Sequence, residues 1–492
     1  MIVISMTMQA GCVAVNLSPK AYDPADFYFV REPNQRQQDP DVYFKHEYRQ
    51  INTRRGGASE ARPPRLLGLS LSGGGIRSAA FQLGLLAGLH STQADGRSLL
   101  ARVDYISSVS GGSWANGAYW SAPEPDAQFF DCLDRYAFSG TTPTGCDSAR
   151  LRLRNRQEIL LIPFDDEVTL IQRKEKWEQD IIEAYVGACN VDFDQRGRFR
   201  DCLGQSALRP YPIFNSTHSS SSESAKPTHF PFESTPDYLG TLVDDPEIDR
   251  GFFVRPGSAD FRWQLRKWQR YFALTAKNRE DRPGAVLSLI LAHSSGVIGS
   301  KKPYLLQYNF HVRFHGRAIR GVRRTYHLTD GGKSENLGIL PLLERGVDTI
   351  VVSQMGKEGQ ELEDPRLAAA QASSLFYCKL PAELPRDTPA VVVQRYSCPT
   401  KSGGFRKGTL IQIRPTTTNV QEFLAYLQRN QPGLYAELMD SDRGEKKAED
   451  HFPETPTFRS EYSKALIRAY YLLGRYLAST AVRTELLREG RL

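Results

Sequence analysis

A short apolar run, three consecutive glycines and a second apolar run follow one another in LGLSLSGGGIRSAAFQLGLLAGL, residues 67–89. The first run, residues 65–72, has the length of a β-strand and stops at Gly73. Beyond the glycines a broad apolar stripe predicts a helix, with Ile76, Ala79, Ala80, Leu83 and 86–89 on it. The chain therefore turns from a strand into a helix through bare backbone.

The same unit occurs a second time a little further along the chain. The β-branched run VDYISSVS, residues 103–110, ends in Gly111-Gly112, and a helix is expected from about Ser113 to Tyr119. Two strand–glycine–helix units in succession predict an α/β fold with a parallel sheet covered by helices. Ligand sites in such folds lie at the carboxyl ends of the strands.

A glycine-rich turn that enters a helix presents free backbone N–H groups, which attract negative charge. A phosphate-binding P-loop needs Gly-Lys followed by Ser or Thr, which GGGIRS lacks, and a dinucleotide fingerprint needs spaced glycines. The remaining interpretation is an oxyanion hole. That interpretation requires a nucleophile nearby.

Ser110 in SVSGGS is a candidate nucleophile because it lies between a strand and a glycine pair, as in a nucleophile elbow. Ser108 stands where the elbow motif usually has glycine. The serine needs a base, and two residues qualify. His451 follows the chain order of a Ser-His-Asp hydrolase, whereas Asp330 in HLTDGGKSENLG ends an apolar strand before two glycines.

Taken together, these motifs resemble the patatin-like phospholipases, and most closely their cytosolic phospholipase A branch. SGGGIR (72–77) resembles the family's oxyanion loop, SVSGGSW its serine elbow, and DGGKSENLGILPLLERGVDTIVVSQ its aspartate motif. PIFNST (212–217), FPFESTPDYLG (230–240) and HFPETPTF with YSKALIRAYYLLG extend the likeness over roughly residues 65–475.

The resemblance implies a role for each matching residue. Ser110 would be the nucleophile, Asp330 the general base, and the backbone N–H groups of Gly73, Gly74 and Gly75 the oxyanion hole. Arg77 would face the phosphate of a lipid, which suits the forked geometry of a guanidinium. The alternative for Arg77 is a salt bridge at the start of the helix.

The resemblance also implies a three-layer α/β/α sandwich with a mainly parallel central sheet and inserted cap or lid segments. We expect a signal-like segment at 1–20, an extended lead-in at 21–64 and a catalytic domain at 65–490, with an insertion at about 121–280. The insertion contains Pro-rich stretches and the Ser-rich run NSTHSSSSESAKPTHF.

The N-terminal segment and the cysteines favour export. MIVISMTMQAGCVAVNLSPK has no charge before Lys20, and its AGC resembles the end of a bacterial lipoprotein signal, which makes Cys12 a candidate for lipidation. The other six of the seven cysteines form three pairs that are close in sequence: Cys132/Cys146, Cys189/Cys202 and Cys378/Cys398. Three disulfides and a lipid anchor are one interpretation, and seven reduced thiols of a cytoplasmic protein are the other.

The composition limits which classes of binding partner we expect. The net charge of +7 is a mild excess over 492 residues, so basic clusters such as RAIRGVRRTYH are interpreted as a solvated face and no nucleic acid is expected. The excess favours anionic membrane surfaces weakly. No calcium-binding membrane-targeting domain is apparent in front, so membrane recruitment would rely on Cys12 and on this surface. The seven Cys and nine His show no metal-ligand spacing, and neither metal nor cofactor is expected.

The sequence thus predicts a serine acyl hydrolase that cleaves acyl esters of phospholipids or lysophospholipids through a Ser-Asp dyad. Three alternatives stay open at this point: a neutral lipase or an acyltransferase with the same dyad, a His451-dependent hydrolase, and a catalytically silent lipid-binding scaffold.

Overall fold

The computed structural model describes fifteen parts of the chain. They are residues 28–31, 40–146, 153, 181–186, 208–219, 229–236, 239–245, 250–254, 308–315, 323–355, 360–381, 391–400, 404–443, 452–453 and 462–488. The run AVLSLILAHSSG, residues 285–296, whose apolar pattern is typical of a strand, lies outside them.

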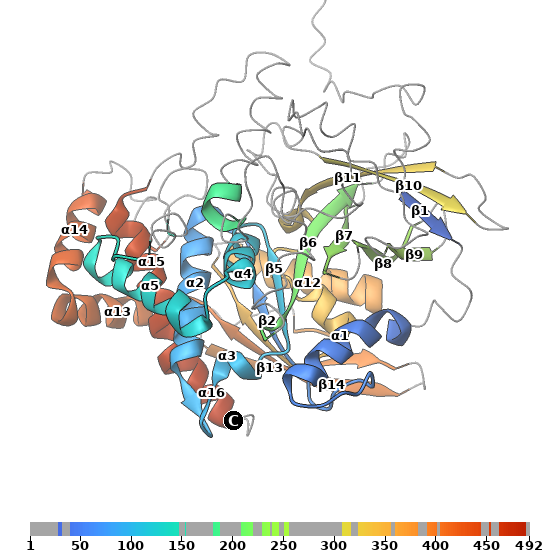
Figure 1. The fold of residues 1–492 in the computed structure, drawn as a ribbon, viewed down its shortest axis with the longest axis horizontal. Coiled ribbons are helices and arrows are strands. Elements are labelled where there is room, and N and C mark those ends of the chain that lie inside the picture. Colours follow the sequence, from blue (N-terminus) through green and yellow to red (C-terminus); the bar gives the residue numbers. More distant parts are fainter. Residues whose placement is uncertain are drawn as a thin grey trace, which may run out of the picture.

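A single large sheet runs through the molecule, in the order β1-β10-β11-β6-β5-β2-β12-β14-β13 (Figure 1). Its centre is parallel and consists of β6 (Tyr211–Ser219), β5 (Tyr105–Val109), β2 (Leu67–Leu71), β12 (Thr349–Ser353) and β14 (Phe405–Ile413). The carboxyl ends of these strands therefore meet at one edge, as the two strand–glycine–helix units predict.

Antiparallel strands complete the sheet at both ends. β13 (Val391–Pro399) pairs with β14, and on the other side β11 (Arg323–Asp330) and β10 (Tyr308–His315) follow β6. The short β1 (Tyr28–Arg31) lies beyond β10 and pairs with it in parallel. A branch of β7 (His229–Ser234), β8 (Leu239–Asp245) and β9 (Arg250–Val254) leaves from β6. A separate two-stranded ribbon consists of β3 (Gln93–Ala94) and β4 (Arg97–Ser98).

Helices cover both faces of the parallel strands. Successive residues of β12 point to opposite faces: Val351 joins one hydrophobic cluster, and Ile350 and Val352 join the other. The first cluster contains side chains of α2 (Gly75–Ser91), α4 (Gly111–Ser121), α5 (Asp126–Ser139), α13 (Thr417–Asn430), α14 (Pro432–Arg443) and α15 (Lys464–Leu477). The second contains side chains of α1 (Pro40–Arg54), α11 (Leu340–Glu344) and α12 (Gln360–Phe376).

The result is a three-layer α/β/α sandwich with a mainly parallel central sheet, so the predicted fold class is confirmed. In Figure 1, α2, α5, α13, α14 and α15 group on one side of the strands, whereas α1 and α12 lie on the other. Short helices α3 (Leu99–Arg102) and α16 (Arg483–Arg488) complete the described helical elements, together with π-helical turns at Ile182–Val186 and Ala478–Val482 and a 3₁₀ turn at Gly331–Lys333.

The structure differs from the prediction of an extended lead-in over residues 21–64. Within that range α1 is helical, and its Phe44, Tyr48 and Ile51 are buried in the second cluster. A buried ion pair attaches α1 to the end of α11, because Arg345, which follows α11, donates to both carboxylate oxygens of Glu47, at 2.8 and 2.9 Å. The buried spacing i, i+4, i+7 is the reason that this polar segment folds as a helix.

The expected insertion at about 121–280 also contains parts of the core. β6 pairs directly with β5 in the centre of the sheet, and α5 contributes Phe129, Phe130 and Leu133 to the first cluster. Long stretches of this range, including 187–207 and 255–280, lie outside the described residues. The cap or lid expected there stays a prediction.

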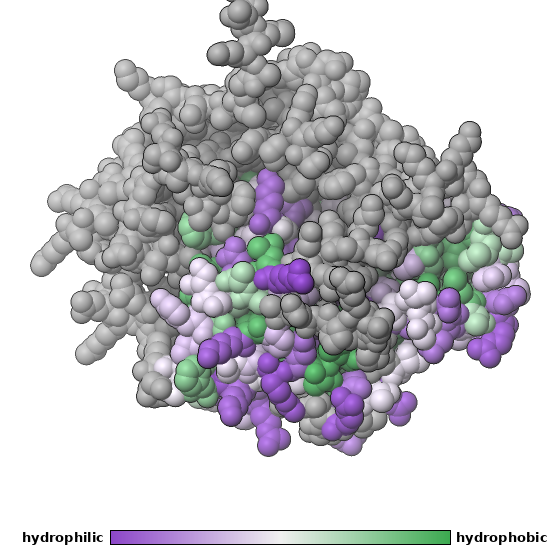
Figure 2. Space-filling model, turned by 180° about the vertical axis from the view of Figure 1, so that it is seen from behind, coloured by the Kyte–Doolittle hydropathy of each residue, from purple (hydrophilic) through white to green (hydrophobic). Residues whose placement is uncertain are grey.

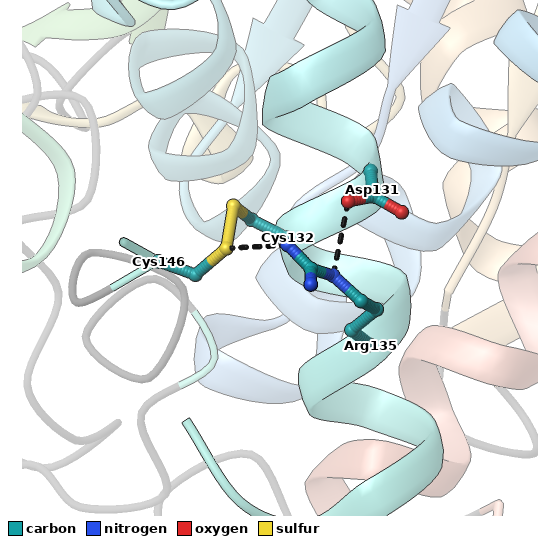
Figure 3. Close-up of a disulfide and its surroundings, with 4 residues drawn as sticks. All are labelled: Asp131, Cys132, Arg135 and Cys146. Carbon is teal, nitrogen blue, oxygen red and sulfur yellow. Dashed lines mark hydrogen bonds and ion pairs between the residues drawn. A yellow bond between two sulfur atoms is a disulfide. The ribbon is translucent and has the colours of Figure 1, made fainter. Parts of the chain in front are cut away.

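Two of the three predicted cysteine pairs are disulfides in the structure. Cys132 on α5 is bonded to Cys146, and Cys378 is bonded to Cys398 on β13. Figure 3 shows Arg135 beside the first bridge, with its guanidinium 3.4 Å from the Cys146 sulfur and 3.0 Å from Asp131. Cys189, Cys202 and Cys12 lie outside the described residues.

The described surface seen from behind mixes hydrophilic and hydrophobic residues (Figure 2). The most exposed large apolar side chains of the described residues are Tyr377, Leu208 and Phe405, which are 77%, 71% and 62% exposed. In the same part of the chain, no helix combines the length and the apolar character that crossing a membrane requires.

Candidate active site

Ser110 lies in a sharp turn between β5 and α4. Its backbone has φ 50° and ψ −123°, a conformation that L-residues rarely adopt and that costs about 1–3 kcal/mol. The turn ends a buried strand and begins a helix, and it leaves the Ser110 side chain partly exposed at the carboxyl edge of the sheet. This is the geometry of a nucleophile elbow.

The two glycines after Ser110 are required by close backbone packing. A β-carbon on Gly111 would overlap the carbonyl oxygen of Gly75, and one on Gly112 would overlap that of Leu71. The elbow is therefore pressed against the end of β2 and the glycine loop that follows it. Contact between the two strand–glycine–helix units explains why both need bare backbone.

Ser108 occupies the elbow position that often holds glycine, and the structure provides partners for its side chain. The residue is fully buried, and its hydroxyl lies 3.2 Å from the carbonyl oxygen of Ile213. The same hydroxyl accepts a hydrogen bond from Asn116 at 3.0 Å and lies 3.3 Å from the Ser113 hydroxyl. These bonds offset the cost of burying a hydroxyl beside the turn.

Asp330 is the last residue of β11 and begins a short 3₁₀ turn, Gly331–Lys333. Its Oδ1 accepts the N–H of Gly332 at 2.7 Å, which fixes the orientation of the carboxylate. The side chain is 7% exposed. Burial lowers the pKa of the neighbouring Lys333 ammonium, and the negative charge of Asp330 opposes that shift.

The two candidate residues meet although 220 positions separate them in the sequence. The Ser110 hydroxyl donates to the second carboxylate oxygen of Asp330, Oδ2, at 2.8 Å. Among the described residues, Asp330 is the one side chain that hydrogen-bonds the Ser110 hydroxyl. Such a pair can deprotonate a serine without an intervening histidine. The rival base, His451, lies outside the described residues.

The glycine loop lies at the amino end of α2, next to Ser110. Gly74 has φ 135° and Gly75 has φ 62°, both in a region that favours glycine. Within the described part of the chain, the N–H groups of Gly74 and Gly75 have no hydrogen-bond partner, as expected at a helix start. Unpaired N–H groups at a helix start can stabilise an anion.

Gly73 differs from the prediction that all three glycines donate to an oxyanion. Its N–H donates to the backbone carbonyl of Asn336 at 3.0 Å and is therefore engaged. A β-carbon on Gly73 would overlap Oδ1 of Asn336 and lie 3.1 Å from the β-carbon of Ser110. Gly73 therefore provides space where the glycine loop, the elbow and the Asn336 carboxamide meet.

Arg77 is buried beneath the glycine loop, with a side chain that is 1% exposed. Its Nη2 donates to the carbonyl oxygen of Met355 at 3.2 Å and lies 3.8 Å from where a β-carbon on Gly74 would be. The Ser72 hydroxyl accepts the N–H of Met355 at 2.8 Å. Arg77 and Ser72 thus attach the loop to the end of β12, and contact of Arg77 with a lipid phosphate stays a prediction.

Three residues near the dyad received no role from the sequence: Asn215, Thr217 and Asn336. They lie in PIFNST and in SENLG, two stretches of the motifs quoted above. Their presence in those motifs was the available signal, but their contacts depend on how distant strands align.

No group of three or more His, Cys, Asp or Glu side chains in the described residues is placed to hold a metal ion.

Comparison with known proteins finds a family match in the part of the chain that contains Ser110. Residues 69–201, which include the glycine loop and Ser110, match the family model of patatin-like phospholipases. The chain is similar to this family over those residues, about a quarter of its length. A search of the curated proteins found no match to it.

Solved structures extend the likeness of fold over most of the chain. Human GIVD cytosolic phospholipase A2 superposes with a TM-score of 0.51 at 13% identity, covering 92% of this chain and 64% of that one. The same human protein in complex with a methyl γ-linolenyl fluorophosphonate inhibitor and terbium chloride gives 0.50 at 15% identity, covering 91% and 63%. The chain thus spans just under two thirds of the length of these structures.

Proposed function

We propose that this protein is a serine acyl hydrolase of phospholipids or lysophospholipids, with Ser110 as the nucleophile and Asp330 as its general base. The observation that carries the proposal is the 2.8 Å hydrogen bond from the Ser110 hydroxyl to the oriented Asp330 carboxylate. The match of residues 69–201 to the family model of patatin-like phospholipases supports a lipid ester as the substrate.

In the first half-reaction Ser110 Oγ attacks the acyl carbonyl carbon while Asp330 Oδ2 takes the hydroxyl proton. The N–H groups of Gly74 and Gly75 stabilise the developing oxyanion, and protonated Asp330 then gives its proton to the leaving alcohol. In the second half-reaction water attacks the acyl-serine, Asp330 takes a proton from that water, and the fatty acid leaves as Ser110 is reprotonated.

The expected contributions follow from general enzymology. General base catalysis contributes about 10²–10⁴-fold to rate. Loss of one oxyanion donor costs roughly 2.7–4 kcal/mol of transition-state stabilisation. The donors here are backbone groups, so substitution of the glycines changes the shape of the loop and not a single bond. Arg77 would favour a phosphodiester headgroup over a neutral ester.

Acyl release from phospholipid vesicles tests the proposal, with the wild type compared with Ser110→Ala, both in chelator and without added calcium. The proposal expects fatty acid release by the wild type and none above background by the variant. Absence of release on phospholipid, lysophospholipid and neutral ester alike would instead support a silent lipid-binding scaffold. Product analysis with an added alcohol separates hydrolysis from acyl transfer.

We further propose that the protein is exported and anchored to a membrane through a lipidated Cys12. Two disulfides and an uncharged stretch before Lys20 support this location. Expression of the full chain in a bacterial host with a radiolabelled fatty acid should label the wild type and not Cys12→Ala. Equal labelling of both proteins, or of neither, would contradict the anchor and leave the hydrolase proposal untouched.

A further inference from the structure

Strand β6 lies between the two strands that carry the dyad. It runs parallel to β5, with Asn215 opposite Val109, and antiparallel to β11, with Ser216 opposite Asp330. Neighbouring strands are about 4.8 Å apart, so the backbones of β5 and β11 are separated by roughly 10 Å. The 2.8 Å bond between Ser110 and Asp330 therefore depends on where β6 holds its two neighbours.

On the β11 side, the Thr217 hydroxyl contacts the turn that follows Asp330. Thr217 is fully buried, and its Oγ1 accepts the N–H of Ser334 at 2.9 Å. The same oxygen lies 3.1 Å from the Gly331 carbonyl and 3.0 Å from the Ser334 hydroxyl. A hydroxyl has a single proton to donate, so one of these two oxygens receives it.

The turn keeps its own hydrogen bonds without Thr217. The Gly331 carbonyl also accepts the N–H groups of Ser334 and Glu335, each at 3.1 Å, and the Ser334 hydroxyl at 3.0 Å. Loss of the Thr217 hydroxyl would therefore leave the turn folded and remove the side-chain hydrogen bonds that attach it to β6. The expected defect is in the position of Asp330.

On the β5 side, the Asn215 carboxamide contacts the strand that leads to Ser110. Its Nδ2 donates to the Ser108 carbonyl and lies within hydrogen-bond distance of the Ser107 hydroxyl, each at 2.9 Å. Asn215 and Thr217 are two residues apart and so lie on the same face of β6. The backbone carbonyl oxygen of Asn215 is also close to Gly331, because it would lie 2.5 Å from a β-carbon added to that glycine.

We propose that Asn215 and Thr217 are positioning residues that set the distance between the Ser110 hydroxyl and the Asp330 carboxylate. The inference rests on the proposed hydrolase function, because it assigns these residues to the same dyad. They act through the main chain on either side of β6 and do not touch the substrate. Misplacement of a reacting group by about 1 Å costs on the order of 10²-fold in rate.

The test compares Thr217→Val, Thr217→Ser and the control Thr349→Val. Thr349 is buried in β12, and among the described residues its hydroxyl has no hydrogen-bond partner, so the control makes the same substitution without breaking a bond. Each protein is assayed for acyl release and for its rate of inactivation by a long-chain alkyl fluorophosphonate. In that reaction Ser110 Oγ forms a bond to phosphorus, fluoride leaves and Asp330 takes the proton.

Thr217→Val should lower kcat and the inactivation rate by about 10- to 100-fold with KM changed less than about 2-fold. Thr217→Ser keeps the hydroxyl and should stay within about 3-fold of wild type, and Thr349→Val should match wild type. Both rates are expressed per folded molecule after titration of reactive sites. If Thr217→Val does not fold, Asn215→Ala tests the other side of β6 with the same expected loss.

Failure of the positioning role and failure of the hydrolase function give different results in these assays. A wild-type rate in folded Thr217→Val, or equal losses in Thr217→Ser and Thr217→Val, would overturn the positioning role while the hydrolase function stood. A change in melting temperature with no change in kcat would overturn it as well, because it indicates a purely structural role. A wild type that neither releases fatty acid nor reacts with the fluorophosphonate would overturn both proposals.

Discussion

Ser110 and Asp330 illustrate how backbone conformation prepares a side chain for chemistry. The positive φ of Ser110 places its hydroxyl above the end of β5, and the Gly332 N–H orients the Asp330 carboxylate, which accepts the hydrogen bond of that hydroxyl. Neither residue is exceptional by type. Their function is proposed from the turn in which each one lies.

At the scale of single residues, Asp330→Asn should lower kcat by about 10²–10⁴-fold, because an amide cannot take the serine proton. His451→Ala should leave kcat unchanged if Asp330 is the base. Steady-state hydrolysis of a soluble acyl ester by both variants checks this. Near-normal turnover of Asp330→Asn together with an inactive His451→Ala would contradict the Ser-Asp dyad and indicate that His451 is the base.

Gly73→Ala should lower kcat by roughly 10²-fold, because the new methyl group overlaps the Asn336 carboxamide and approaches the Ser110 β-carbon. Gly57→Ala is the matched control, since a β-carbon there meets nothing closer than 3.5 Å. The same hydrolysis assay compares the two. A wild-type kcat in Gly73→Ala would mean that the glycine loop and Asn336 can move apart without loss of activity.

At the scale of elements, α2 and α15 pack closely enough for their backbones to touch. A β-carbon on Gly84 of α2 would overlap the Tyr471 carbonyl, and one on Gly474 of α15 would overlap the Phe81 carbonyl. α2 begins at the glycine loop, so its packing against α15 fixes the helix start beside Ser110. The layer over this face of the sheet and the candidate site are thus mechanically connected.

Gly84→Ala should therefore destabilise the fold by about 1–3 kcal/mol or more, although alanine is the better helix former. Gly433→Ala in α14, where a β-carbon meets nothing within 4 Å, should be neutral or stabilising by up to about 1 kcal/mol. Thermal unfolding of both variants measures the difference. A Gly84→Ala midpoint equal to or above that of Gly433→Ala would contradict the contact between the two helix backbones.

The sequence was informative where local patterns decide structure and less so where distant contacts do. The strand–glycine–helix units predicted the parallel sheet, and the position of Ser110 between strand and glycines predicted the elbow. Helix α1 was missed because its polar residues dominate, although Phe44, Tyr48 and Ile51 carry a helical spacing. The engaged N–H of Gly73 could not be predicted, because its partner Asn336 is distant in sequence and becomes a neighbour only in the folded chain.

At the scale of the whole molecule, the two disulfides cross-link outer parts of the sandwich. Cys132–Cys146 attaches the chain after α5 to that helix, and Cys378–Cys398 attaches the chain after α12 to the edge strand β13. They close loops with sequence separations of 14 and 20 residues. Neither bridge includes a residue of the secondary-structure elements that carry Ser110 and Asp330.

Reduction should lower stability by about 3 kcal/mol for each bridge in the chain-entropy estimate, with little effect on hydrolysis at low temperature. Non-reducing peptide mapping of the protein from an oxidising compartment should recover both bridges, and thermal unfolding with and without reductant should measure their effect. Free thiols at all four positions in such a sample would contradict the pairing.

The most direct test of the account is the site of covalent reaction with a fluorophosphonate, mapped by peptide mass spectrometry in wild type, Ser110→Ala and Asp330→Asn. The Ser-Asp dyad predicts one phosphonylated peptide, modified at Ser110, that is absent from Ser110→Ala and forms at least roughly 10²-fold more slowly in Asp330→Asn. Modification at another serine, or equal labelling of Ser110 in the wild type and Asp330→Asn, would contradict it.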